Sequence, residues 1–262
     1  MYSSRLVHSA VLCVVLAGAV TACGSSKGTS SQAAAPGSAS QSGSNLSALS
    51  ASQVLDQAKA AMGSLSSMHA KGYVTTDSDK ITLDLSAGKN KDCTGTVSSA
   101  SDGSMQIIHT SAGTWMKPDA TFLQNIASHE NSKAGAAAVQ LFQGRWLTGG
   151  QDDPDLQSMA AMCDLMANMA DDDSKQTGAT KGSATTVNGT PALTVQVSDD
   201  SGPSTVYVAT QGQPYLLRME NKGSDGGSVD FSDFNKPLNI QAPPADQVID
   251  FSVFQQKVKA SV

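Results

Sequence analysis

The sequence predicts an α+β domain, in which a few helices pack over one face of an antiparallel β-sheet. Short stretches of alternating apolar and polar residues follow one another between turn signals in two runs, residues 70–117 and 180–234. A block of Ala-rich and Met-rich segments, residues 120–170, separates the two runs. Strands joined by short turns favour hairpins, and helices grouped between runs of strands favour α+β over alternating βα units.

A helix is expected at the start of the domain, over residues 52–65. Ser50 suits its N-cap, because a serine hydroxyl can accept a hydrogen bond from a free N–H of the first turn. Apolar residues recur at the spacing of one helical face, so the helix has a single stripe to bury. The stripe consists of Val54, Leu55, Ala58, Ala61, Met62 and Leu65.

A meander of strands is expected after this helix. Residues 81–85 alternate between apolar and polar side chains, which is typical of a strand with one buried and one solvated face. Turn signals such as Asp102-Gly103 separate the strands. The five expected strands are residues 70–76, 80–86, 94–99, 104–110 and 114–117.

Helices are expected in the middle of the chain, at residues 120–127, 134–142 and 156–170. The last has a start signal in Asp152-Asp153-Pro154-Asp155, since proline and acidic residues favour the first turn of a helix.

Strands then resume, and Asn188-Gly189 predicts a tight hairpin, because a type I′ turn needs two residues with positive φ. The tail, residues 237–249, is expected to be extended before a short helix or coil. The expected strands are residues 180–187, 192–198, 205–209, 216–221 and 228–234.

The N-terminus reads as a secretory signal, residues 1–22. An apolar run follows the positive Arg5 but is shorter and less pure than the about 20 apolar residues of a membrane span. The run ends in Val20-Thr21-Ala22-Cys23, which resembles the lipobox of bacterial lipoproteins. The resemblance implies cleavage before Cys23 and a diacylglyceryl group on its thiol. Two acyl chains hold a protein on a membrane much better than one. An ordinary signal peptide or an uncleaved anchor is the alternative.

Residues 23–50 are expected to be a disordered tether behind the lipidated cysteine, and residues 51–262 a single folded domain. The tether is rich in Ser, Gly and Ala and has no aromatic residue, so it cannot offset the entropy of ordering itself.

Cysteine usage predicts one disulfide. Of the four cysteines, Cys13 would be removed with the signal and Cys23 would carry lipid. Cys93 and Cys163 remain as a pair in a protein bound for an oxidising exterior, where disulfides persist. Metal ligation or a reactive thiol are the alternatives, but the sequence has no CxxC motif to support them.

Charge and motifs exclude several classes of function. The net charge is −6, which gives nucleic acid no basic surface to bind. The sequence has no HExxH or P-loop motif. Its one G-x-S-x-G match, Gly24–Gly28, lies in the Ser/Gly-rich stretch after Cys23 and not at a strand-to-helix turn, so it is no nucleophile elbow. Neither an enzyme, a cofactor nor a metal site is therefore expected. Asp152–Asp155 and Asp171–Asp173 lack the glycine turn and closing Glu of a calcium loop.

Three stretches resemble the LppX/LprG-type lipoproteins of mycobacteria and their actinobacterial relatives. They are Ser104–Ile108 followed by Gly113–Asp119, then Val187–Ala192, and finally Phe231–Pro237 with Ala242–Pro244. The resemblance implies a LolA/LolB-like fold, a curved antiparallel sheet forming a half-open barrel whose concave face is covered by helices. In several family members the space between sheet and helices holds acyl chains.

Bulky apolar residues are the candidates for lining such a cavity. Methionine is unbranched and polarizable, so a methionine stripe on one helix face suits flexible acyl chains. The alternative is that all of these are ordinary core residues. The candidates are Trp115, Phe122, Leu141, Phe142, Trp146, Met159, Met162, Leu165, Met166 and Met169.

We therefore expect a lipoprotein anchored to the outer face of the cytoplasmic membrane that binds a lipid, lipoglycan or lipidated molecule in an apolar cleft and could carry it. The alternative is a cell-surface module with a filled core and no lipid cargo, which binds an envelope protein or a cell-wall component. The sequence does not identify that protein partner.

Overall fold

The computed structural model describes residues 45–76, 79–129, 139–140, 142–149, 157, 160–164, 177–199, 202–223, 226–250 and 253. These residues belong to one compact unit, Gln41–Val262. The expected signal, Cys23 and most of the expected tether lie outside the described residues.

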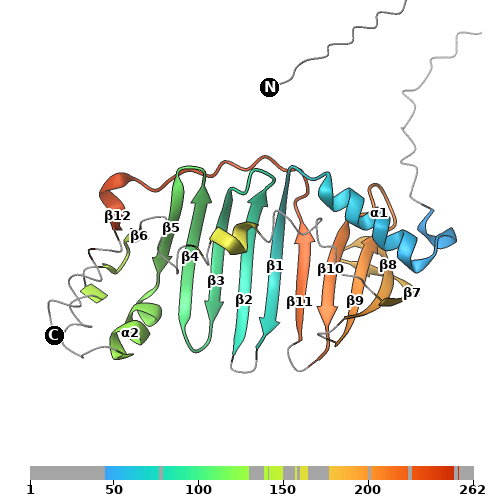
Figure 1. Cartoon of the computed structure of the whole chain (residues 1–262), viewed down its shortest axis with the longest axis horizontal. Helices are drawn as coiled ribbons and strands as arrows, with labels where there is room; N and C mark the ends of the chain where they lie inside the picture. Colours follow the sequence, from blue (N-terminus) through green and yellow to red (C-terminus); the bar gives the residue numbers. More distant parts are fainter. Residues whose placement is uncertain are drawn as a thin grey trace, which may run out of the picture. The chain divides into compact units, whose positions relative to one another are not determined.

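One twelve-stranded sheet runs through this unit in the spatial order β12-β6-β5-β4-β3-β2-β1-β11-β10-β9-β8-β7 (Figure 1). The two predicted runs of strands meander outward from the middle, where β1 pairs with β11. The strand pairs are antiparallel except β12–β6, and β12 and β7 form the two edges of the described sheet. The strands are β1 (Ser67–Thr75), β2 (Lys80–Gly88), β3 (Cys93–Ser99), β4 (Gly103–Thr110), β5 (Gly113–Pro118), β6 (Trp146–Thr148), β7 (Thr177–Val187), β8 (Thr190–Asp199), β9 (Gly202–Ala209), β10 (Leu216–Asn221), β11 (Gly227–Ser232) and β12 (Val248–Asp250).

The cross-strand register collects apolar side chains on one face of the sheet. Along each strand the apolar residues alternate with polar ones such as Thr82 and Asp84, which therefore lie on the opposite face. One row on the apolar face, read from β11 to β6, consists of Phe231, Ala70, Leu85, Gly95, Ile107, Met116 and Leu147.

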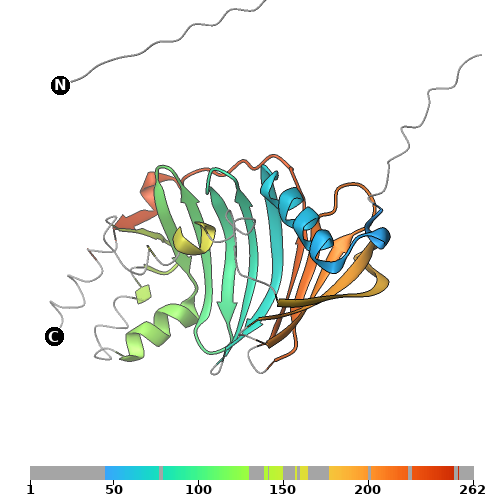
Figure 2. The same cartoon turned by 45° about the vertical axis from the view of Figure 1, so that its right-hand side comes forward.

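The sheet is curved, and in Figure 2 helix α1 (Ala51–Gly63) lies inside the curve. Val54 and Ala58 of this helix share one buried core with Leu85 and Ile107, so the apolar face is the concave one. Glycines explain part of the bend. A Cβ atom at Gly72 would lie 2.0 Å from Ser228 O, and one at Gly95 would lie 2.1 Å from Asp84 O. Neighbouring backbones therefore approach at these positions more closely than a side chain allows, as at the bends of barrels. The predicted α+β class with a curved, unclosed antiparallel sheet is confirmed.

Two helices pack on this concave face. Helix α1 (Ala51–Gly63) is capped as expected: Gln53 N–H donates to Ser50 Oγ at 3.2 Å, and Ser50 N–H donates to Gln53 Oε1 at 2.9 Å. It lies beside β7, β9 and β10. Helix α2 (Ala120–His129) starts at Asp119, which accepts from Phe122 N–H and from Ser104 N–H of β4. The 3₁₀ helices are η1 (Leu46–Ala48) and η2 (Ala245–Gln247).

The other two expected helices are described only in part. Residues 139–140, 142, 157 and 160–164 are helical, and the rest of 134–142 and 156–170 lie outside the described residues. The short strands β6 and β12 were not predicted. Each has three residues, too few for an alternation pattern, and they are strands because they pair with each other.

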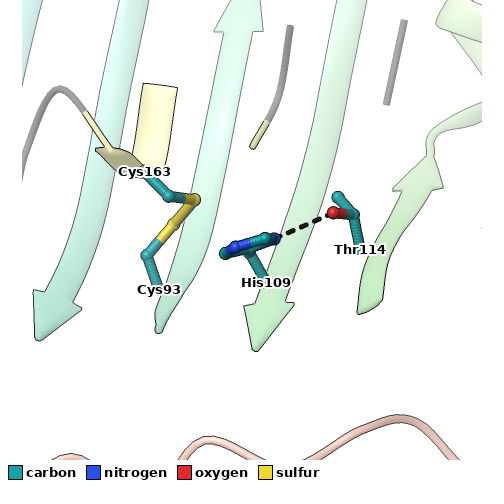
Figure 3. Close-up of a disulfide and its surroundings, with 4 residues drawn as sticks. All are labelled: Cys93, His109, Thr114 and Cys163. Atoms are coloured by element: carbon teal, nitrogen blue, oxygen red, sulfur yellow. Dashed lines mark hydrogen bonds between the residues drawn. A yellow bond between two sulfur atoms is a disulfide. The ribbon is translucent and has the colours of Figure 1, made fainter. Parts of the chain in front are cut away.

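The predicted disulfide between Cys93 and Cys163 is present (Figure 3). It joins the start of β3 to the segment 160–164, and both cysteines are fully buried. Lys91 Nζ, which precedes β3 by two residues, lies 3.2 Å from Asp164 Oδ2 in the same segment. A covalent bond and an ion pair therefore hold this segment on the concave face.

Residues 236–247 follow β11 as an extended strap along one end of the sheet and lead to β12 (Figure 1). Ser67 Oγ donates to Lys236 O, and Leu238 lies beside Gly88. Arg145 Nη1 donates to Asp246 O at 2.6 Å, close to the beginning of β6. We call this end of the strands the strap end and the opposite end, which carries the β1–β2, β3–β4 and β10–β11 turns, the far end.

Candidate functional site: an apolar strip at the far end

The exposure of the apolar side chains on the concave face increases from the strap end to the far end. Near the strap end its side chains are buried, with Leu85 and Ile107 each 1% exposed. Toward the far end the same strands carry apolar side chains that stay partly exposed, and Val74 is 39% exposed. We call this set the apolar strip. Its members are Val74, Ile81, Leu83, Val97, Met219 and Val229.

The sheet register brings the strip together from five strands. Val74 on β1 pairs with Ile81 on β2, and Leu83 on β2 pairs with Val97 on β3. On the other side Met219 of β10 pairs with Val229 of β11. The strip therefore crosses the middle of the sheet, where the two runs of strands meet.

Gly72 lies in the centre of the strip, paired with Leu83 on one side and opposite Val229 on the other. Because the backbone of Ser228 occupies the place of its Cβ, no larger residue fits there without shifting β11. The strip therefore has large apolar side chains on both sides of a position that carries none.

Hydrogen bonds between polar groups join the turns at the far end. The carboxylate of Asp79, before β2, accepts from the hydroxyl and the N–H of Ser101, after β3. Hydrogen bonds from the Ser101 and Ser99 hydroxyls hold the pKa of Asp79 well below its usual range. Asn125 of α2 donates to Ser101 O, so α2 is tied to the same turn.

The chemistry of the strip is that of a binding surface. Its six side chains hold no ionisable group, so they offer neither a nucleophile nor an acid or base. Keeping apolar area in water costs about 25 cal/mol per Å², and contiguous exposed apolar residues often mark places where a ligand or partner binds.

Ionisable groups gather on the opposite, convex face. His69 Nε2 lies 2.7 Å from Asp84 Oδ1 and its Nδ1 lies 3.4 Å from Ser232 Oγ, while Lys71 Nζ lies 2.8 Å from Asp84 Oδ2. Hydrogen bonds from Lys71 and from His69 lower the pKa of Asp84. Lys71 and His69 thus share the Asp84 carboxylate, and the group ties β2, β1 and β11 together.

The residues predicted to line a cavity divide into three groups. Phe142 is fully buried in the core, and Phe122 and Met162 pack against it. Trp115 and Trp146 alternate with the core residues Met116 and Leu147 and so lie on the convex side, where Lys117 sits over the Trp146 ring at 5.7 Å. Outside the described residues lie Leu141, Met159, Leu165, Met166 and Met169.

No pattern in the sequence alone singled out the strip. Alternation in residues 81–85 could have identified Ile81 and Leu83 as residues of the apolar face. It could not show that they remain partly exposed, or that Val229 comes to lie in the same row.

Two further properties concern the part of the chain that the structure describes. Within it, no group of three or more His, Cys, Asp or Glu side chains is arranged to hold a metal ion. None of its helices has the length and apolar character needed to cross a membrane.

The sequence matches no protein-family model and no curated protein. Solved structures with a similar fold include LprF from Mycobacterium bovis, which is 14% identical over 74% of this chain and 97% of its own, with a TM-score of 0.49. The Mycobacterium tuberculosis lipoprotein LppX is 14% identical over 73% of this chain and 98% of its own, with a TM-score of 0.46. The Pseudomonas aeruginosa MucA/MucB complex matches with 13% identity, 75% and 59% coverage and a TM-score of 0.31. Similarity of this degree says nothing about what this chain binds.

Proposed function

We propose that this protein is a membrane-anchored extracytoplasmic lipoprotein that binds the acyl chain of a lipid or lipidated molecule along the apolar strip. The partial exposure of the six strip residues carries the proposal, because the apolar residues nearer the strap end of the same face, such as Leu85 and Phe231, are buried. The lipobox-like residues that end at Cys23 support the anchor.

An acyl chain is the ligand whose chemistry fits this surface. Each methylene taken out of water contributes about 0.8 kcal/mol, and the interaction needs no hydrogen-bond partner from the protein. The strip provides apolar atoms on five adjacent strands and no charge in the path of the chain. Its far end borders polar turns at Asp79 and Ser101, which suit a polar headgroup left in water.

Binding in this manner involves no bond making, and the protein acts as a carrier or receptor. The strap end and the Cys93–Cys163 disulfide fix one end of the concave face. A ligand would enter and leave at the far end, where the apolar residues reach water.

The test is acyl-chain binding by the whole chain and by two variants of adjacent β2 residues. In Ile81→Asp a charge enters the strip, and in the control Thr82→Asp the same charge enters the convex face of the same strand. A fluorescent fatty acid is titrated against each protein, and native mass spectrometry records co-purified lipid.

We expect Ile81→Asp to weaken binding at least ten-fold, because an unpaired charge in an apolar site is costly. The variant should also lose co-purified lipid. Thr82→Asp should bind like the parent. Equal binding by both variants, or a parent without lipid and without affinity for the probe, would contradict the acyl-chain proposal and favour a protein or cell-wall partner.

The anchor is tested separately. Replacing Cys23 by Ala should move the protein from the membrane fraction to the soluble fraction. Retention of the variant in the membrane would rule out lipidation at Cys23 as the anchor.

A further inference from the structure

The concave face carries a cysteine, a histidine and a threonine in one row, and acyl-chain binding does not use them. At the strap end, Cys93, His109 and Thr114 form a single cross-strand row on β3, β4 and β5. Directly opposed residues of an antiparallel pair have Cβ atoms about 5 Å apart, so the imidazole neighbours the cysteine on one side and the threonine on the other. Figure 3 shows the His109 ring between the disulfide and Thr114.

Thr114 orients this ring. His109 Nδ1 and Thr114 Oγ1 share a hydrogen bond of 2.8 Å. With Nδ1–H as the donor, Nε2 carries no proton and can accept one. A thiol, a neighbouring base and a third group that fixes the base make up the arrangement that activates nucleophilic cysteines.

The positions of these residues along the chain indicate when the arrangement would act, namely during folding. Cys93 and His109 belong to one local hairpin, whereas Cys163 lies 70 residues beyond Cys93. Hairpins form within microseconds and long loops close later. We therefore expect Cys93 to come to lie beside His109 during folding before its partner cysteine arrives.

We propose that Cys93, His109 and Thr114 form a thiol-activating site, in which His109 takes the proton of Cys93 and thereby drives formation of the Cys93–Cys163 disulfide with an external disulfide as oxidant. The Cys93 thiolate attacks one sulfur of the oxidant, for example glutathione disulfide. A bond forms between Cys93 and glutathione, and the second glutathione leaves and takes the proton from His109.

In the second step Cys163 loses its proton to His109, and its thiolate attacks Cys93 Sγ. The mixed disulfide breaks, and the glutathione that was bonded to Cys93 leaves with the proton from His109. Two thiols are oxidised and one glutathione disulfide is reduced to two glutathiones, so electrons and protons balance. In the described residues, the charged groups around the row are Lys91 and Asp92 before Cys93 and Asp164 after Cys163, with Lys91 paired to Asp164.

The experiment measures the reactivity of Cys93 alone. The whole chain carries Cys13→Ser, Cys23→Ser and Cys163→Ala. Because Cys93 is fully buried in the folded protein, its glutathionylation by glutathione disulfide is followed by mass spectrometry during refolding from urea, at pH 7 and pH 9. The variants are His109→Gln, Thr114→Val, which keeps the shape of the side chain, and the control His69→Gln, which removes a histidine from the convex face. Circular dichroism confirms that each variant is folded.

We expect His109→Gln to slow the reaction about ten-fold at pH 7, because an ordinary thiol with a pKa of about 8.5 is only about 3% ionised there. Thr114→Val should slow it less, and His69→Gln should leave it unchanged. At pH 9, where thiols ionise without help, the rates should converge.

Three results would overturn the proposal. They are equal rates for the parent and His109→Gln at pH 7, a loss in His109→Gln that persists at pH 9, and a Cys93 that glutathione disulfide does not modify. The second result would assign His109 a purely structural part in placing Cys93.

Discussion

Leu85 and Leu83 lie two residues apart on the same face of β2, yet Leu85 is 1% exposed and Leu83 remains partly exposed. The strands are continuous across both positions, and both leucines have apolar neighbours in register. The difference comes from what packs over them. At the strap end the segment 160–164, which the disulfide joins to β3, packs in the same core as Leu85, whereas at the far end the strip stays partly exposed.

Under the proposed function, one sheet provides both stability and a binding surface. Burial at the strap end supplies the hydrophobic contribution to folding, and the strip at the far end would leave apolar area for a ligand. Changes at the strap end should therefore act mainly on stability, and changes at the far end mainly on binding.

The largest expected effect comes from the disulfide. Cys93→Ala should lower the free energy of unfolding by about 4 kcal/mol, the chain-entropy value for a loop of 70 residues. Urea unfolding of the variant, compared with the oxidised parent, measures it. A loss below about 1 kcal/mol would mean that the strap end does not depend on the bond.

Substituting the two leucines tests the comparison directly. Leu85→Ala should cost about 3 kcal/mol as a cavity-forming change in a packed core, and Leu83→Ala about half as much. Binding of the acyl probe should respond in the opposite order, with Leu83→Ala weakening it more. Equal losses of stability from both variants would erase the distinction between the two ends.

An ion pair on the convex face should stabilise the strap end and the far end equally. Arg218 donates to the Asp230 carboxylate through Nε and Nη2, and the Nη2–Oδ2 distance is 2.8 Å. Asn188 Nδ2 donates to the same carboxylate at 3.0 Å. Hydrogen bonding by Arg218, with a smaller part from Asn188, lowers the pKa of Asp230 against the effect of desolvation.

Because the folded-state pKa lies below the unfolded value, this contribution is complete above about pH 4 and is lost as the pH falls through the folded-state pKa. Asp230→Asn should therefore lower stability by about 1.5 kcal/mol at pH 7 and flatten its decline below pH 4. Acyl-probe binding should not change. Unfolding curves between pH 2 and pH 7 provide the check.

The smallest effect is expected at the far-end turns. Asp79→Asn keeps the shape of the side chain but weakens the bonds from Ser101 that join the β1–β2 and β3–β4 turns. Hydrogen exchange should speed up in these turns and remain unchanged at the strap end. Faster exchange spread evenly over both ends would show that the far end does not open on its own.

The sequence alone determined the parts of this protein that local chemistry controls. Asn188-Gly189 forms the predicted turn, with positive φ at both residues, because few other residues adopt that conformation. Ser50 and Gln53 form the expected cap, since both partners lie within one helical turn. The pairing of Cys93 with Cys163 followed from counting cysteines.

Only the tertiary structure decided how the two runs of strands join into one sheet. The pairing of β1 with β11 joins residues about 160 positions apart, and no local pattern encodes it. The same pairing brings Val229 beside Gly72 and so creates the strip. Alternation separates the two faces of a strand, but exposure depends on which distant segment packs over each face. For that reason the sequence indicated an apolar face, and only the fold showed where that face meets water.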